Sequence, residues 1–372
     1  MAAASETIQT IARLTPLAEV LALIDREVKP VAARSVELRL GAGRVLAADV
    51  TAPMLPKAPI AILDGWALAA DSTLGAGGYS PVLLPAMPQR VEAGQPMPPG
   101  ADCVVAFDAV KVSGGRAEAL DTVNPGDGVL PAGADCDGKA PLRRAGDVLR
   151  SLDGAVFAAA GISRVSVREP RIMVLPLRKG DVVDAAVGLV GGDIESRGGA
   201  AHRADCGCKL ATALARDNVD AIVAIGGTGQ GRNDTSVQTL AREGRLVAHG
   251  MALSPGETAA FGFAGPRPVL LLPGRLDAAL SVWLVAGRRM LARLTGGRDH
   301  EPGMTATLAR KVTSTVGLAA VVPVRRSGDN VEPLATKYLS LSSLAGSDGW
   351  ILVPADSEGY PAGSQILVRP WP

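Results

Sequence analysis

The sequence has no excess of charge of either sign and no long apolar run. Its 372 residues include 38 Lys and Arg against 37 Asp and Glu, which leaves a net charge of +1. A chain so close to neutral has no global field that would attract nucleic acid or an acidic membrane, so any anion must be bound locally. Although 47% of the residues are hydrophobic, glycine or charge interrupts every apolar run before it reaches the length of a membrane span. We therefore expect neither a nucleic-acid partner nor a membrane partner.

A secretory leader and a cysteine framework are also missing. Residues 1–15 carry Glu6 and Arg13 and lack the apolar block of a signal peptide, so we expect a cytoplasmic protein without disulfides. Of the four cysteines only Cys206 and Cys208 are close together, as a C-x-C pair. A structural zinc site usually needs two such pairs, so we expect ordinary thiols here.

The chain is too long for one hydrophobic core, because single cores stop growing near ~250–300 residues. An apolar stripe at helical spacing runs from Leu17 to Val28, and it predicts an amphipathic helix with Thr15 as its N-cap and Pro16 as its first residue. From about residue 43 to 161, short apolar runs alternate with proline and glycine clusters. This alternation predicts β-structure with tight turns.

In the second half of the chain the predicted elements follow the order strand, glycine loop and helix. Buried strands are predicted at 172–175, 221–225 and 269–272, and a helix follows the last of them from Leu276 to the stop at Gly296. This pattern predicts an open, mainly parallel α/β domain. Three further strand patterns, separated by Gly and Asp turns, predict a C-terminal β-domain, and they lie at 321–324, 351–353 and 366–368.

We therefore predict a multidomain α/β protein with a mainly parallel α/β domain, N-terminal helical and β domains, and a C-terminal β-domain. The expected boundaries are a helical linker domain of residues 1–45 with 141–168, a β-rich domain of 46–140, the α/β domain of 169–300, and the β-domain of 301–372.

The glycine-rich loop from Gly226 to Gly231 is the sharpest local motif. It follows a predicted strand and precedes a predicted helix, so bare N–H groups and the positive end of the helix dipole would favour an anion. No Gly-Lys-Ser/Thr follows, which excludes a Walker loop, and no acidic partner ends the next strand, which excludes a dinucleotide fingerprint. Because ligands collect at the carboxyl edge of such sheets, we favour anion binding over an ordinary turn. Residues 272–275 form a second loop of this kind.

Several segments in a fixed order carry a family resemblance that covers nearly the whole chain. They resemble the MoeA / gephyrin E-domain family of molybdopterin molybdotransferases, and the proline-rich segment is the most specific. The segments are Gly43–Val50 (GRVLAADV), Asp64–Ala67 (DGWA), Ala93–Val105 (AGQPMPPGADCVV), Gly226–Gly227 with Asp234, Ser254–Gly256 (SPG), Leu272–Gly274 (LPG) and Lys337–Leu344 (KYLSLSSL).

The resemblance implies a homodimer in which the N-terminal half of one subunit faces the α/β domain of the other across a pterin-binding cleft. It also implies hydrolysis of adenylated molybdopterin and insertion of molybdate with the help of acidic residues and Mg²⁺. By position, the retained catalytic carboxylates are Asp64, Asp135 and Asp234, and Asp64 and Asp234 would hold the metal, since hard divalent ions prefer oxygen ligands. The implied cofactor-binding residues are Gly226, Gly227, Thr228, Gly229, Gly231, Arg232, Ser254, Pro273, Gly274 and Arg275.

The sequence also departs from the family pattern. Val182 replaces a glutamate that the family offers to catalysis, Ser254 and Glu257 replace lysines, and Arg275 replaces an asparagine. Arginine holds a phosphate bidentately but cannot act as a base, so these changes favour binding over hydrolysis.

Two functions therefore stay open. One is molybdate insertion into adenylated molybdopterin, and the other is a non-catalytic paralogue that binds molybdopterin or the finished cofactor as carrier or scaffold for a molybdoenzyme or another cofactor-biosynthesis protein. An adenylyltransferase of the same pathway ranks last, because it would not need the two β-regions.

Overall fold

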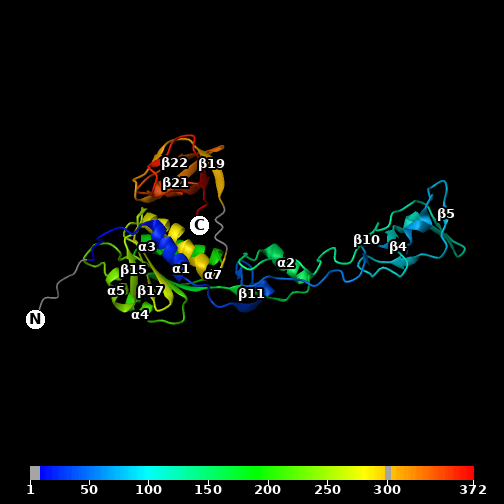
Figure 1. Cartoon of the computed structure of the whole chain (residues 1–372), viewed down its shortest axis with the longest axis horizontal. Coiled ribbons are helices and arrows are strands. Elements are labelled where there is room, and N and C mark those ends of the chain that lie inside the picture. Colours follow the sequence, from blue (N-terminus) through cyan, green and yellow to red (C-terminus); the bar gives the residue numbers. More distant parts are fainter. Residues whose placement is uncertain (1–8, 298–302) are drawn as a thin grey trace, which may run out of the picture. The chain divides into compact units, whose positions relative to one another are not determined.

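The computed structural model describes residues 9–297 and 303–372 (Figure 1). The chain forms two compact units. Unit 1 comprises the described residues of Met1–Ala48, Ala145–Gly154 and Arg164–Pro372, and unit 2 comprises Asp49–Arg144 and Ala155–Ser163. Within the described residues, no helix is both long and apolar enough to cross a bilayer.

Unit 1 contains the predicted α/β sheet. The three predicted buried strands are present and lie next to one another in parallel, because each is a continuous run of fully buried aliphatic residues. One parallel strand at one edge and two antiparallel strands at the other, none of which the sequence pattern predicted, complete the sheet. The strand order is β13 (Ala200–Arg203), β12 (Arg171–Pro176), β14 (Ala221–Ile225), β18 (Arg267–Leu272), β17 (Ala260–Ala264) and β15 (Arg245–His249).

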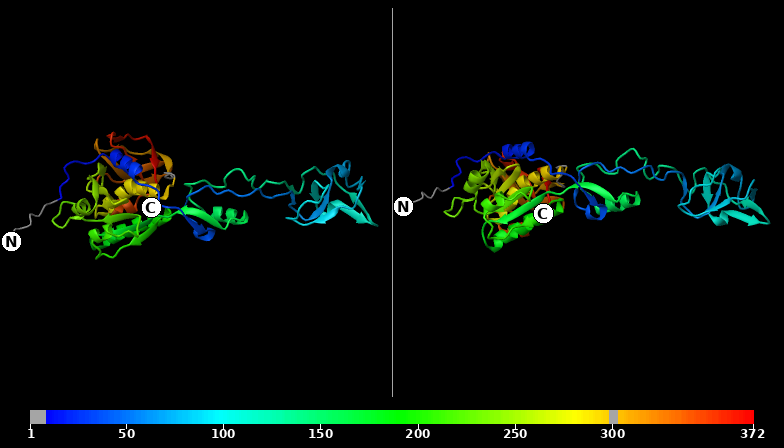
Figure 2. Two further views of the ribbon diagram at one scale, coloured as in Figure 1. Left: turned by 60° about the horizontal axis from the view of Figure 1, so that its bottom comes forward. Right: turned by 90° about the horizontal axis from the view of Figure 1, so that it is seen from below.

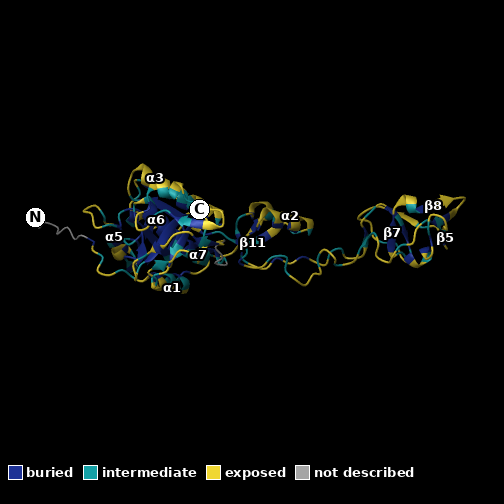
Figure 3. Ribbon diagram, turned by 90° about the horizontal axis from the view of Figure 1, so that it is seen from above, coloured by how far each residue is buried: buried dark blue, intermediate teal, exposed yellow. Residues whose placement is uncertain are grey.

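Helices cover both faces of this sheet. Figure 3 shows α6 in the buried interior of this domain, with exposed residues on α1 and α3. The predicted helix after β18 is present but contains a π-helical turn, and Gly296 ends it with φ 64°, as expected of a glycine stop. The helices are α1 (Leu17–Glu27), α3 (Asp181–Ser196), α4 (Leu210–Leu214), α5 (Ser236–Glu243), α6 (Leu276–Val282), the π turn (Trp283–Gly287) and α7 (Arg288–Thr295).

The predicted N-terminal helix is confirmed, but its predicted cap is wrong. Helix α1 begins at Leu17, Pro16 occupies the N-cap position, and no side chain caps the helix. Thr15 is instead bridged in parallel to Met251, with its N–H bonded to the Gly250 carbonyl at 2.9 Å. Its backbone is therefore held in extended form by a distant segment. The apolar face of α1 joins the core of the α/β sheet and packs against α7, and the blue and yellow helices lie together in Figure 2.

The C-terminal β-domain is confirmed, and all three predicted strand patterns fall on strands of one sheet. Ser340 caps the short helix of this domain by accepting from the Ser343 N–H at 3.1 Å. The elements are β16 (Leu253–Ser254), β19 (Met304–Leu308), β20 (Val312–Thr313), β21 (Ala319–Ser327), β22 (Asn330–Pro333), α8 (Leu341–Ala345), β23 (Gly349–Val353), β24 (Gly359–Tyr360) and β25 (Gln365–Val368).

The β-structure predicted between residues 43 and 161 is also present, as several small sheets joined by tight turns. Most of it belongs to unit 2. The strands there are β3 (Ile60–Ala61), β4 (Gly65–Leu68), β5 (Val82–Leu83), β6 (Gln89–Val91), β7 (Cys103–Val105), β8 (Val110–Ser113), β9 (Arg116–Ala119) and β10 (Val129–Leu130). Three more strands form a small sheet in unit 1, β1 (Arg34–Glu37), β2 (Val45–Leu46) and β11 (Arg164–Arg168), and helix α2 spans Ser151–Ala159.

Candidate functional site

The two predicted anion loops meet at the carboxyl edge of the sheet. The Gly226 N–H donates to the Leu272 carbonyl at 2.9 Å, which joins the ends of β14 and β18. A Cβ added to Gly274 would lie 3.5 Å from the Gly226 Cα, so the two backbones are in direct contact. The loop after β12 lies alongside, since the Leu177 N–H donates to the Ile225 carbonyl at 2.9 Å. Three loops from parallel strands therefore converge at one edge, as such sheets require of a ligand site.

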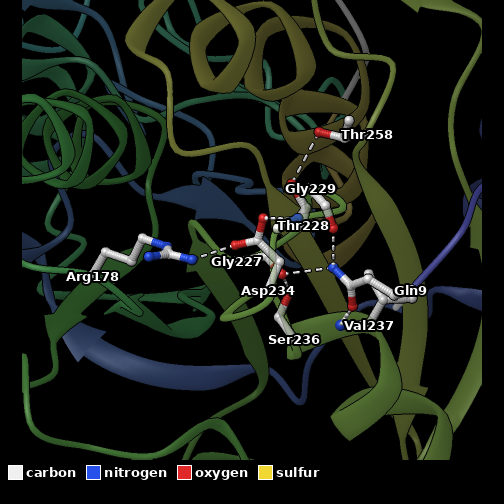
Figure 4. A network of polar contacts seen from close by, with 10 residues as sticks. Gln9, Arg178, Gly227, Thr228, Gly229, Asp234, Ser236, Val237 and Thr258 are labelled. Atoms are coloured by element: carbon white, nitrogen blue, oxygen red, sulfur yellow. Dashed lines mark hydrogen bonds and ion pairs between the residues drawn. The ribbon is translucent and has the colours of Figure 1, made fainter. Parts of the chain in front are cut away.

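The glycine loop is held in place by side chains from three directions (Figure 4). The Gly227 carbonyl accepts from Ser236 Oγ at 2.6 Å and from Gln9 Nε2 at 2.9 Å. The same Gln9 Nε2 donates to the Gly229 carbonyl at 2.6 Å. On another side of the loop, the Thr228 and Thr258 hydroxyls lie 3.1 Å apart. The loop conformation is thus set by contacts outside the loop itself.

Asp234 closes this loop. Its Oδ1 accepts from Arg178 Nη2 at 2.5 Å, and its Oδ2 accepts from the Gly231 N–H at 3.1 Å. A Cβ at Gly229 would come within 2.6 Å of Oδ2, so a side chain there would displace the carboxylate. Each carboxylate oxygen already accepts one hydrogen bond, and the Arg178 guanidinium on Oδ1 would repel a divalent cation at that oxygen.

Asp64 and Asp135 lie in unit 2, both in exposed turns. Asp64 Oδ1 accepts from the Ala93 N–H at 2.8 Å, and the Asp135 backbone N–H donates to the Leu55 carbonyl at 3.0 Å. Among residues 9–297 and 303–372, no group of three or more His, Cys, Asp and Glu side chains is arranged to hold a metal ion. Asp64 and Asp234 belong to different units, so their joint metal site stays a prediction.

The predicted anion-binding arginines differ in their surroundings. Arg275 makes a bidentate ion pair with Asp277, in which Nε donates to Oδ1 at 3.1 Å and Nη2 donates to Oδ2 at 2.5 Å. Its guanidinium lies 4.8 Å from the centre of the Tyr338 ring. Arg232 is exposed and makes no ion pair in the described part of the chain. Ser254 is buried in β16. Arg275 is therefore occupied by its neighbours, while Arg232 is free to meet a ligand.

A cavity of about 360 Å³ opens beside the glycine loop in unit 1. Three of its lining side chains are cations, Arg178, Lys209 and Arg242, and none is a carboxylate. Of the predicted cofactor-binding residues it includes only Gly227. The full lining is Leu177, Arg178, Cys206, Gly207, Cys208, Lys209, Leu210, Ala211, Gly227, Asn233, Thr235, Ser236, Thr239 and Arg242.

Sequence reasoning missed several of these residues. Thr235 and Ser236 directly follow the glycine loop, so proximity in sequence was an available signal. Lys209 comes from the turn between β13 and α4 and Gln9 from the N-terminal segment, and no local pattern connects either to the loop. Gln9 also caps α5, because its Oε1 accepts from the Val237 N–H at 3.2 Å. The start of that helix is therefore partly satisfied by the protein itself.

Curated relatives match this chain along most of its length. It is 24% identical to a putative molybdopterin biosynthesis protein of Methanocaldococcus jannaschii, over 90% of this chain and 91% of that protein. It is 25% identical to molybdopterin molybdenumtransferase 2 of Mycobacterium tuberculosis, over 94% of this chain and 97% of that protein. The fold matches the crystal structure of the molybdopterin biosynthesis moeA protein from Pyrococcus horikoshii, with a TM-score of 0.76 at 23% identity over 96% of this chain and 100% of that one.

Three family models match successive parts of the chain. The MoeA N-terminal region (domain I and II) matches residues 15–161, the probable molybdopterin binding domain matches 194–293, and the MoeA C-terminal region (domain IV) matches 305–371. The glycine loop and its strand lie within the second match, and the resemblance predicted from the sequence motifs is confirmed. The chain belongs to the MoeA family of molybdenum cofactor biosynthesis proteins.

Proposed function

We propose that this chain binds molybdopterin at the carboxyl edge of its α/β sheet and inserts molybdate into it. The observation that carries the proposal is the cavity of about 360 Å³ beside the glycine loop, which Lys209, Arg178 and Arg242 line. The two arginines are paired with Asp234 and Glu243, whereas Lys209 makes no ion pair in the described part of the chain. Molybdopterin carries a phosphate, and charge-assisted hydrogen bonds from Lys and Arg are strong contacts for that group. Ser236, Thr235 and Asn233 supply hydroxyl and amide groups on the same wall for the polar pterin.

The insertion step is assigned to carboxylates. Asp64, Asp135 and Asp234 are the acidic residues at the family's positions, and we propose them for the hydrolysis and insertion steps. Asp234 would first have to exchange its bond with Arg178 for one with the substrate. A divalent ion on Oδ1 of Asp234 would likewise have to displace the Arg178 guanidinium.

A second candidate function is binding of molybdopterin or the finished cofactor without insertion, as carrier or scaffold. The Arg178–Asp234 ion pair favours it, because that pair occupies the most enclosed of the proposed catalytic carboxylates. The Asp234 side chain is 16% exposed. Val182, which stands in place of the family's glutamate, is 50% exposed and offers no acid or base.

An insertion assay separates the two functions. Purified protein is mixed with adenylated molybdopterin, molybdate and magnesium, and the product is measured by its ability to activate a molybdenum-free apoenzyme. Molybdopterin binding is measured in parallel by calorimetry. Binding with activation supports the insertase, and binding without activation supports the carrier. Absence of binding contradicts both.

The cavity is tested by Lys209→Ala. We expect molybdopterin to bind on the order of tenfold more weakly, because one charge-assisted hydrogen bond is lost, and the difference should shrink as salt rises. Lys311→Ala is the matched control, since Lys311 is also an exposed lysine but lies in the C-terminal β-domain. Equal affinities of the two variants in low salt would show that the phosphate lies elsewhere.

A further inference from the structure

Gln9 is a buried polar residue that joins the N-terminal segment to the glycine loop. It is 5% exposed and lies 218 residues before Gly227 in the sequence. Its amide group donates to the carbonyls of Gly227 and Gly229, and its oxygen accepts from the Val237 N–H (Figure 4). The amide orientation is therefore unambiguous, because the reverse orientation would place the side-chain oxygen against two carbonyls and the amine against an N–H.

These contacts fix the orientation of two peptide groups. In a planar trans peptide the C=O and the next residue's N–H point in opposite directions. With the carbonyls of Gly227 and Gly229 turned toward Gln9, the N–H groups of Thr228 and Gln230 point away from it. Neither N–H makes a hydrogen bond within residues 9–297 and 303–372. Thr228 is only 2% exposed, and buried N–H groups are nearly always paired.

The Gly227 carbonyl has hydrogen-bond donors other than Gln9. It already accepts from Ser236 Oγ at 2.6 Å and from the Ser236 N–H at 3.2 Å, which accounts for both of its lone pairs. The additional donor from Gln9 therefore does more than pair a buried acceptor. It also holds two alternate peptides of the loop, 227–228 and 229–230, with both carbonyls turned toward Gln9.

We propose that Gln9 is a positioning residue that presents the Thr228 and Gln230 N–H groups to an oxyanion of the ligand. The inference rests on the proposed function for the ligand's identity, a phosphate-bearing pterin. In this proposal the two N–H groups donate hydrogen bonds to the anion, and the N-terminal segment is part of the site. Successive N–H groups that point to one side form an anion-binding concavity, and here a side chain outside the loop imposes that arrangement.

Gln9→Leu is the first test, because leucine keeps the volume and removes all three hydrogen bonds. We expect the dissociation constants of molybdopterin and of inorganic phosphate each to rise on the order of tenfold. We also expect faster amide hydrogen exchange in the peptide 226–237 without ligand, since the Val237 N–H loses its acceptor. Gln365→Leu is the matched control, because it removes one side-chain bond to Thr307 in the C-terminal β-domain. Melting temperature confirms that each variant is folded.

Gln9→Glu gives a readout that a merely structural role would not change. The glutamate carboxylate would face two carbonyl oxygens, whereas its protonated form could donate to one of them and still accept from Val237. Burial favours the neutral form, so protonation occurs at accessible pH. The ratio of variant to parent dissociation constants, taken at each pH to cancel the phosphate's own titration, should fall toward one as the pH is lowered.

The outcomes separate this inference from the proposed function. Unchanged exchange in Gln9→Leu, or a Gln9→Glu ratio that does not vary with pH while the parent binds, overturns the positioning role. If the parent binds no molybdopterin, the proposed function fails. The exchange experiment and the phosphate measurements then still decide whether Gln9 sets the loop for an anion.

Discussion

Asp234 and Arg275 show how neighbours decide what a charged residue can do. By position both were predicted to act on the ligand. Asp234 is held by Arg178 and by the Gly231 N–H, and Arg275 by Asp277 and the Tyr338 ring. An ion pair of this kind must be broken before either group meets a substrate, which costs part of the binding free energy. Lys209, which no motif indicated, has no such competitor in the described part of the chain.

Cys103 allows a prediction about thiol chemistry. Burial, with Asp102 and Asp127 nearby, raises the pKa of its thiol to about 11. Because the thiolate is the reactive species, we expect iodoacetamide at pH 8 to label Cys103 on the order of a hundredfold more slowly than an ordinary cysteine. Cys136, Cys206 and Cys208 are partly exposed and serve as internal controls. Mass spectrometry of timed digests measures all four, and equal labelling of Cys103 in the folded protein would contradict its burial.

At the scale of elements, Asp193 joins α3 to the π turn and to the first residue of α7. Its carboxylate accepts from Arg288 Nε at 2.8 Å, Arg288 Nη2 at 2.9 Å and Trp283 Nε1 at 2.7 Å. Asp193 and Arg288 are 4% and 5% exposed, so neither charge can be solvated by water if the other is removed. Trp283 opens the π turn, and this bond joins that turn to α3.

Asp193→Asn should therefore destabilise unit 1 strongly. The substitution removes the negative charge from a buried ion pair while the Arg288 guanidinium stays buried, and breaking such a pair typically costs about 3–5 kcal/mol. Asp184→Asn is the matched control, because Asp184 lies on the same helix but pairs with Arg203 at the surface, where a pair contributes about 0–1 kcal/mol. Denaturant titration followed by circular dichroism measures both. A loss of stability no larger than that of the control would show that the buried pair adds little.

The same carboxylate predicts a pH dependence. Burial alone would raise the pKa of Asp193, but the hydrogen bonds and charge of Arg288 outweigh it and hold that pKa below its usual value. A depressed carboxyl pKa stabilises the folded state above the unfolded pKa, and the contribution is lost as the pH falls below about 4. The parent should therefore lose part of its stability between neutral pH and pH 3, and Asp193→Asn should lose less over the same range. Parallel losses would contradict the assignment.

At the scale of the whole molecule, the family resemblance predicts a homodimer whose site is shared between subunits. Asp64 and Asp135 lie in one compact unit of the chain and the glycine loop in the other. Light scattering at micromolar concentration should give twice the mass of one chain. A monomer mass that persists at that concentration would contradict a site shared between two copies.

Much of the fold followed from local pattern. The parallel strands are runs of aliphatic residues between glycine loops, the helix stop at Gly296 needs a left-handed residue, and the family landmarks are contiguous motifs. Each of these depends on residues within a few positions of one another, so composition and spacing reveal them. The antiparallel strands β15 and β17 were missed because their burial depends on the neighbouring strand.

The sequence by itself determined the family, the parallel sheet and the position of the glycine loop, because short-range hydrophobic period and turn chemistry specify such features. Only the tertiary structure decided which groups surround that loop. Gln9 reaches Gly227 across 218 residues, and Lys209 joins Ser236 at one cavity only because two loops end at the same sheet edge. Contacts of this range come from the packing of whole elements, so no local pattern in the chain contains them.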